Sequence, residues 1–298
     1  MSKPGMRRRG RAGWIFVAPA LIVLAVFFFL PVLAAFVMSL TDFDLYALSD
    51  FSNLRFIGFR NYAQLLVDPL FWKALGNTVY FVVLGVPLSI AASLGAALLV
   101  NSKLARFRNV FRTIYFAPVV TTLVAVAVVW RYIFHTRYGF LNYALGFLGI
   151  DPIDWMGDPH WAMPAIVVLA VWKNFGYNMI ILLAALQSIP EDLYEAARID
   201  GASTWQLFRH VTLPGLAPVL MLVSILTMTG YFQLFAEPYV MTEGGPLQST
   251  LSVLYFMFEE GFKWWSLGRA SAVAFLLFVL MFVVTLVQLR IGRPERGA

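Results

Sequence analysis

The sequence predicts an all-α membrane protein with six transmembrane helices. Hydrophobic residues make up 60% of the 298 positions and charged residues only 13%, whereas a soluble domain is roughly 45–50% apolar and about 25% charged. Long apolar runs such as residues 15–30, IFVAPALIVLAVFFFL, do not alternate with polar residues, which excludes a transmembrane β-barrel. This composition also excludes an ordinary soluble enzyme and a disordered chain. The absence of cysteine excludes disulfides, iron–sulfur clusters and cysteine-ligated zinc.

Six segments are long and apolar enough to cross a bilayer. A hydrocarbon core about 30 Å thick needs about 20 helical residues, and backbone groups in lipid must be hydrogen-bonded within their own segment. The fourth segment alone is interrupted by a charge, at Lys173. The predicted spans are about 14–38, 78–100, 114–130, 162–186, 216–235 and 270–289, forming one domain, residues 14–289, between tails 1–13 and 290–298.

The first segment has one alternative reading, a signal peptide. Arg7, Arg8, Arg9 and Arg11 precede the apolar run, as in a signal sequence. The hydrophobic region of a signal peptide has about 7–15 residues. Because this run is longer and continues through Pro31, we expect it to be a retained first span.

The distribution of Lys and Arg predicts that both termini lie in the cytoplasm. With that orientation 14 of the 22 basic residues flank the inside ends of the spans and seven lie outside. Cytoplasmic loops carry an excess of Lys and Arg. The sequence therefore predicts an N-in, C-in topology.

The inside loop of residues 187–214 is too structured to be only a tether. Ser188 is predicted to cap one helix and Ser203 a second, residues 204–211, which Pro214 ends. Gly201 is predicted to end the first helix in the left-handed conformation. An exposed apolar patch usually marks a protein partner, although the loop could pack on the protein's own helices or lie at the lipid interface. The apolar side chains concerned are Leu193, Ala196, Ala197, Trp205 and Phe208.

This loop resembles the EAA signature of ABC importer permeases. The signature has EAA, three residues and glycine, which are Glu195-Ala196-Ala197 and Gly201 here, and a hydrophobic–proline ending, near Leu213-Pro214. Three outer motifs are similar to the carbohydrate-uptake branch, the maltose-type and glycerol-3-phosphate-type sugar permeases. They are Phe59-Arg60-Asn61-Tyr62, Gly244-Gly245-Pro246 with Ser249-Thr250, and Gly268-Arg269-Ala270-Ser271-Ala272.

The resemblance implies a permease subunit of an ATP-driven sugar importer, in the bacterial cytoplasmic (inner) membrane. The chain has no phosphate-binding loop of the form GxxxxGK[ST], so we expect a non-catalytic subunit without a cofactor. The implied partners are two copies of an ATP-binding cassette ATPase, a second homologous permease, a periplasmic or extracellular sugar-binding protein and membrane lipid, with no nucleic acid. The implied ATPase-coupling residues are Glu195, Ala196, Ala197, Asp200, Gly201 and Ala202.

Polar side chains in spans four and five predict where a sugar would pass. Such residues usually face a cavity or a neighbouring helix. Amides and hydroxyls suit sugar hydroxyls, and aromatic rings suit the CH surface of a sugar. The resemblance places substrate contacts on these same spans. The alternative is that the residues only bond neighbouring helices. The predicted path comprises Lys173, Asn174, Gly176, Tyr177, Asn178, Thr227, Tyr231 and Gln233.

Lys173 leaves the substrate class open. Its ammonium could snorkel outward, pair with Glu237, or meet an anionic substrate such as glycerol-3-phosphate or another polyol-type solute, although a neutral sugar is favoured. An ion-coupled secondary transporter would need carboxylates inside the spans, and a membrane enzyme would need a polar catalytic cluster. The sequence predicts neither, nor a metal site, because its three histidines are scattered.

Overall fold

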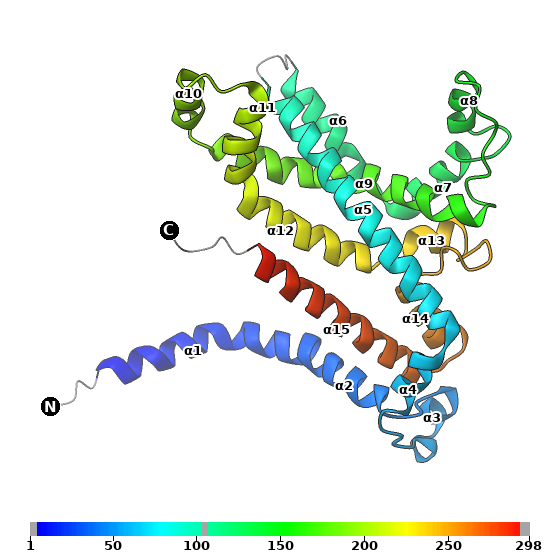
Figure 1. Cartoon of the computed structure of the whole chain (residues 1–298). Coiled ribbons are helices and arrows are strands. Elements are labelled where there is room, and N and C mark those ends of the chain that lie inside the picture. The colour runs from blue at the N-terminus through cyan, green and yellow to red at the C-terminus, as the bar shows by residue number, and fades with distance from the viewer. Residues whose placement is uncertain (1–4, 103–106, 293–298) are drawn as a thin grey trace. The chain divides into compact units, whose positions relative to one another are not determined.

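The computed structural model describes residues 5–102 and 107–292 (Figure 1), and these contain helices and no strand. The only bridge among the described residues pairs Thr41 with Phe56. The prediction of an all-α protein is confirmed. The chain divides into two compact units, residues 1–67 with 257–276, and residues 68–256 with 277–298. Parts of both predicted tails, residues 1–4 and 293–298, lie outside the described residues, as do residues 103–106 in the loop between predicted spans two and three.

The first unit begins with one long apolar helix in three parts. This long helix starts at Gly5, nine residues before the start of the predicted first span. Asn61 stabilises the C-terminal end of this helix. Its Nδ2 donates to the carbonyls of Ser39 (2.9 Å) and Thr41 (2.8 Å). These carbonyls follow a helix C-terminus and need such donors. The elements are α1 (Gly5–Leu24), the π-helix η1 (Ala25–Phe29), α2 (Leu30–Ser39), α3 (Leu45–Ser49), the 3₁₀ turn η2 (Phe51–Asn53), α4 (Arg60–Val67), the π-helix η4 (Glu259–Lys263) and the start of α15 (Leu267–Ile291).

The second unit holds the two longest helices, α5 (Pro69–Asn101) and α9 (Pro159–Ser188). Each begins at the proline of an Asp-Pro pair, with the aspartate at the N-cap position. The Asp68 carboxylate accepts from the Leu70 amide and Asp158 from the His160 amide, each at 2.8 Å, and proline suits the first helical turn. The His160 amide also lowers the pKa of Asp158. The other elements are α6 (Arg108–Val120), α7 (Leu123–Ile133), α8 (Phe140–Gly146), α10 (Glu191–Ile199), α11 (Thr204–Leu207), the π-helix η3 (Phe208–Thr212), α12 (Leu213–Phe232), α13 (Ala236–Met241) and α14 (Val253–Phe258).

The third predicted span, residues 114–130, is not one straight helix. It is divided between α6 and α7, which are bent by 101° at the break. Among the described residues five helices are long and apolar enough to cross a membrane, and a sixth span exists if α6 and α7 count as one.

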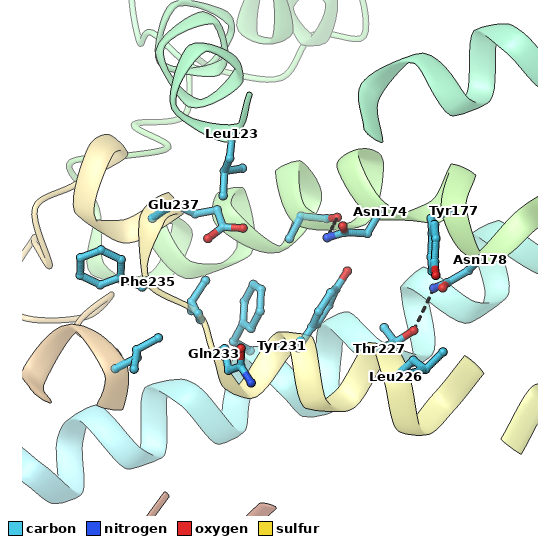
Figure 2. A pocket seen from close by; sticks show the side chains of 16 residues that line it. Leu123, Asn174, Tyr177, Asn178, Leu226, Thr227, Tyr231, Gln233, Phe235 and Glu237 are labelled. Carbon is cyan, nitrogen blue, oxygen red and sulfur yellow. Dashed lines mark hydrogen bonds between the residues drawn. The ribbon is translucent and has the colours of Figure 1, made fainter. Parts of the chain in front are cut away.

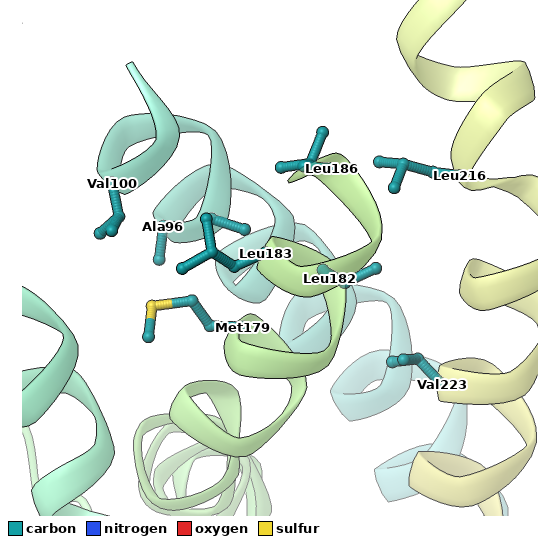
Figure 3. Packing of buried hydrophobic residues seen from close by; sticks show 9 residues of the cluster. Ala96, Val100, Met179, Leu182, Leu183, Leu186, Leu216 and Val223 are labelled. Carbon is teal, nitrogen blue, oxygen red and sulfur yellow. The ribbon is translucent and has the colours of Figure 1, made fainter. Parts of the chain in front are cut away.

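The core of the second unit joins α5, α9 and α12 (Figure 3). Small side chains on α5, Ala96 and Ala97, let α9 approach closely. Met179 and Leu182 of α9 are fully buried there, as is Leu216 of α12. This packing holds α9 and α12 side by side, so their polar residues face a shared space. The cluster comprises Ala96, Ala97, Val100, Met179, Leu182, Leu183, Leu186, Leu216 and Val223.

Candidate functional site

The loop of residues 187–214 begins with an exposed short helix, α10, and continues into α11. No residue of α10 is buried. Gly201 ends α10 at φ +81°, and the Ala202 amide donates to the Ala197 carbonyl at 2.9 Å, which closes the helix end in the manner expected of a left-handed glycine. Glu195 is exposed on this helix, and Leu193 and Trp205 are 53% and 65% exposed. Charged and apolar side chains of this loop are therefore exposed together.

Two details of the predicted loop are wrong. Ser188 does not cap α10, because its hydroxyl donates to the Ala185 carbonyl within α9 (2.7 Å); Pro190 occupies the cap position instead. Pro214 does not end the second helix. The chain runs from α11 through η3 into α12, with Pro214 in the first turn of α12. A π-helical turn widens the backbone and accommodates a proline that would clash in a regular helix. The predicted cap at Ser203 is present as a capping box with Gln206.

A cavity of about 490 Å³ lies in the second unit, between α9 and α12 and beside α13 (Figure 2). Its wall combines amide, hydroxyl, carboxyl and aromatic groups. It is lined by Phe81, Leu123, Ala170, Asn174, Tyr177, Asn178, Leu226, Thr227, Gly230, Tyr231, Gln233, Leu234, Phe235, Ala236, Glu237 and Leu254.

The polar groups of the wall are not equally available to a ligand. Asn178 Nδ2 donates to Thr227 Oγ1 at 2.9 Å, so this pair bonds α9 to α12. Asn174 Nδ2 donates to the Ala170 carbonyl at 3.0 Å. Tyr231 is only 5% exposed, its ring lies 4.9 Å from that of Phe81, and its hydroxyl lies near the side chains of Ser89 and Asn174 without a well-formed hydrogen bond to either. A buried hydroxyl without a partner needs one, and here it lies in the wall of the cavity.

Two residues of the predicted path do not line this cavity. The Lys173 ammonium donates to the carbonyls of Pro118 (2.9 Å) and Thr121 (2.9 Å), at the break between α6 and α7. Gly176 faces α6, since a Cβ added there would lie 1.9 Å from the Tyr115 carbonyl oxygen. The remaining six, Asn174, Tyr177, Asn178, Thr227, Tyr231 and Gln233, are brought together.

Sequence reasoning missed the apolar part of the wall, and it named Glu237 only as a possible partner of Lys173. Phe81, Leu123 and Phe235 line the cavity, but a chain with 27 phenylalanines offers no pattern that marks two of them. Glu237 lies just beyond α12, in α13. Burial raises the pKa of its carboxyl, and the positive charge of Lys173 partly opposes that rise. An acidic residue directly after a span was its only signal.

Comparison with known proteins identifies the family. Residues 85–294 match the family described as binding-protein-dependent transport system inner membrane component. The chain belongs to this family. This permease is thus a multi-pass protein of the cytoplasmic membrane, as predicted. It is 38% identical to the lactose transport system permease protein LacF of Rhizobium radiobacter, over 95% of both chains. It is 37% identical to the trehalose/maltose transport system permease protein MalF of Thermococcus litoralis, over 97% of this permease and 96% of that one.

The fold of the permease is also found in solved structures. A bacterial ABC transporter involved in the import of the acidic polysaccharide alginate superposes with a TM-score of 0.81, covering 97% of this permease and 98% of that chain at 22% identity. The same transporter in complex with an alginate pentasaccharide-bound periplasmic protein gives a TM-score of 0.79, covering 96% and 95% at 22% identity. At this identity the likeness establishes the fold of the permease and not its substrate.

Proposed function

We propose that this permease moves a sugar, a mono- or oligosaccharide, into the cell through the cavity between α9 and α12. The observation that carries the proposal is the composition of the cavity wall, where amides and hydroxyls lie beside the rings of Phe81, Tyr177 and Tyr231. Such a wall provides hydrogen bonds for sugar hydroxyls and flat faces for its CH surface. Relatives at 37–38% identity are permeases for lactose and for trehalose and maltose. Both termini lie in the cytoplasm in this proposal, and transport proceeds by alternating access.

The alternative substrate, an anionic polyol such as glycerol-3-phosphate, was considered because the ammonium of Lys173 could bind its negative charge. Its ammonium donates to three backbone carbonyls, those of Pro118, Val119 and Thr121, and an ammonium has three donors. Among the described residues no basic side chain lines the cavity, whereas Glu237 does. A neutral sugar fits this wall better than an anion. Membership of the family also disfavours an ion-coupled secondary transporter.

Replacing Asn174 with leucine is expected to lower sugar uptake about tenfold. The change removes one amide from the cavity wall, and a lost hydrogen bond to a ligand costs about 1.4 kcal/mol, or tenfold. Uptake is measured as ATP-dependent accumulation of radiolabelled sugar in liposomes that contain the complete importer. Asn109→Leu makes the same chemical change on an exposed residue of α6 and serves as control. Equal uptake by the two variants would contradict a sugar path through this cavity.

Energy for transport enters, in this proposal, through the exposed helix α10. Two ATPase subunits bind there, a second permease completes the membrane pore, and a binding protein delivers the sugar outside. The carboxylate of Glu195 is exposed on α10, so it is accessible to a basic group of the ATPase. The coupling residues are proposed to be Glu195, Ala196, Ala197, Asp200, Gly201 and Ala202, which lie in the C-terminal half of α10 and in the turn that follows it.

Replacing Glu195 with alanine is expected to reduce the stimulation of ATP hydrolysis by sugar-loaded binding protein at least tenfold. A charged hydrogen bond between proteins is worth about 1.5–3 kcal/mol. ATP hydrolysis is measured in liposomes with all the subunits present. Asp192→Ala removes an exposed carboxylate from the first turn of the same helix and should leave the stimulation unchanged. If both variants are stimulated like the parent, α10 is not the coupling element.

A further inference from the structure

The sequence at the sharp bend between α6 and α7 explains the bend only in part. Sharp helix kinks occur at proline, at glycine or serine pairs, at π-bulges, or where a side chain inserts into the hydrogen-bond ladder. The residues at the break, VVTTLV over positions 119–124, contain neither glycine nor proline. Pro118 perturbs the turn that precedes it, whereas the break follows it, at Thr121 and Thr122, which are extended. Thr121 caps the end of α6 locally, since its hydroxyl donates to the Pro118 carbonyl at 2.6 Å and its amide donates to the same carbonyl at 3.3 Å. These contacts close the last turn of α6 but do not fix the direction of α7, so a further cause of the bend lies on another element.

Lys173 of α9 supplies that cause. Its Nζ lies 2.9 Å from the carbonyl oxygens of Pro118 and Thr121 and 3.4 Å from that of Val119. The carbonyls at a helix C-terminus lack partners within the helix, and in lipid they must find a donor elsewhere. The positive charge also lies at the negative end of the α6 dipole. The ammonium thus donates to the Val119 and Thr121 carbonyls, and it adds a charged donor to the Pro118 carbonyl, which also accepts from Thr121.

The place of Lys173 is itself well defined. Gly176, less than one turn along α9, lets the α6 backbone approach so closely that a Cβ would lie 1.9 Å from the Tyr115 carbonyl oxygen. On the other side of the break, the ring of Trp172 lies 5.4 Å from that of Trp130 in α7. Residues 172–176 of α9 therefore contact both arms of the broken span.

The break determines one wall of the cavity. Leu123, the first residue of α7, lines it. From there α7 runs to α13, where Arg131 Nη1 donates to the Val240 carbonyl at 3.3 Å. In a straight third span, α7 would continue along the axis of α6, and Leu123 would leave the cavity.

We propose that Lys173 is a positioning residue, which holds the third span broken and thereby keeps Leu123 in the wall of the cavity. It contributes no contact to the solute, because its three donors are used by the backbone. The proposal holds whichever solute passes through the cavity, so it does not depend on the sugar proposed above.

Distance measurement between two spin labels tests this directly, because the chain has no cysteine of its own. Val110→Cys in α6 and Val129→Cys in α7 place labels at exposed positions of the full-length chain in lipid nanodiscs. Lys173→Met, which keeps the side-chain length without charge or donors, is expected to lengthen the label separation by about 10 Å, given a rise of 1.5 Å per residue in a straightened helix. Lys173→Arg keeps the charge and the donors and should retain the parent separation.

An unchanged separation in Lys173→Met would overturn the proposal, and so would an equal lengthening in both variants. If Lys173→Met does not give folded protein by circular dichroism, Lys173→Leu, which also lacks charge and donors, takes its place with the same two outcomes. The cavity wall is tested with Leu123→Cys, whose reaction with a charged maleimide should become at least fivefold slower when Lys173→Met is added. An unchanged rate would refute the role of Lys173 in placing Leu123.

Discussion

Replacing Gly176 with alanine is expected to lower the free energy of unfolding by about 3 kcal/mol, the upper range for overpacking a core. The added Cβ would lie 1.9 Å from the Tyr115 carbonyl oxygen, 2.7 Å from its carbonyl carbon and 3.1 Å from the Phe116 Cα. All three atoms belong to the backbone of α6, so no side-chain rotation relieves the clash. The helices must separate, and the contacts that Lys173 makes with the end of α6 must lengthen with them.

The apparent unfolding midpoint, followed by circular dichroism in detergent, should fall by roughly 10 °C. Gly76→Ala is the matched control, because it makes the same change within a helix, α5, where a Cβ meets no atom within 4 Å. Alanine favours a helix over glycine by about 1 kcal/mol, so the control should be neutral or stabilising. Equal midpoints for the two variants would show that α6 and α9 are not in backbone contact.

Gly176 also shows where reasoning from the sequence ends. The spacing of Asn174, Tyr177 and Asn178 predicts that they share one face of a helix, and all three line the cavity. Lys173 precedes these three residues in the sequence and Gly176 lies among them. Successive residues of a helix point about 100° apart, so Lys173 and Gly176 point in other directions than the polar face. The sequence alone does not say which neighbour each direction meets, and here both directions meet α6.

The length and polarity of the apolar runs sufficed to predict most helices, since a membrane forces such runs to satisfy their own backbone. Departures from regular helix were not predictable in the same way. The break after Val120 involves a lysine 52–55 residues further along the chain. Likewise Pro214 is accommodated by the preceding π-helical turn, η3. The break and the position of Pro214 depend on a contact with a distant residue and on a widened helical turn, and the local sequence does not predict either one.

Replacing Gly85 with valine is expected to reduce sugar uptake about a hundredfold. A Cβ on Gly85 would lie 2.6 Å from Tyr231 Cε2 and 3.0 Å from Cδ2. The clash at Gly176 is with backbone atoms, whereas this one is with a side chain and can be relieved by rotation. The Tyr231 ring is expected to turn away from α5 and into the cavity that it lines. The fold should survive, while the space for a sugar is lost. Uptake is measured in liposomes that hold the complete importer.

Gly95→Val, in the same helix and with no described atom within 4 Å of an added Cβ, makes the same change in helix propensity and should transport normally. Tyr231→Ala combined with Gly85→Val provides the decisive comparison. If the defect of Gly85→Val arises from the clash with the tyrosine ring, the double variant should transport better than Gly85→Val alone, and the two substitutions will show a favourable coupling energy. Purely additive losses would mean instead that Gly85 acts elsewhere, and the assignment of Tyr231 as the group displaced into the sugar path would be wrong.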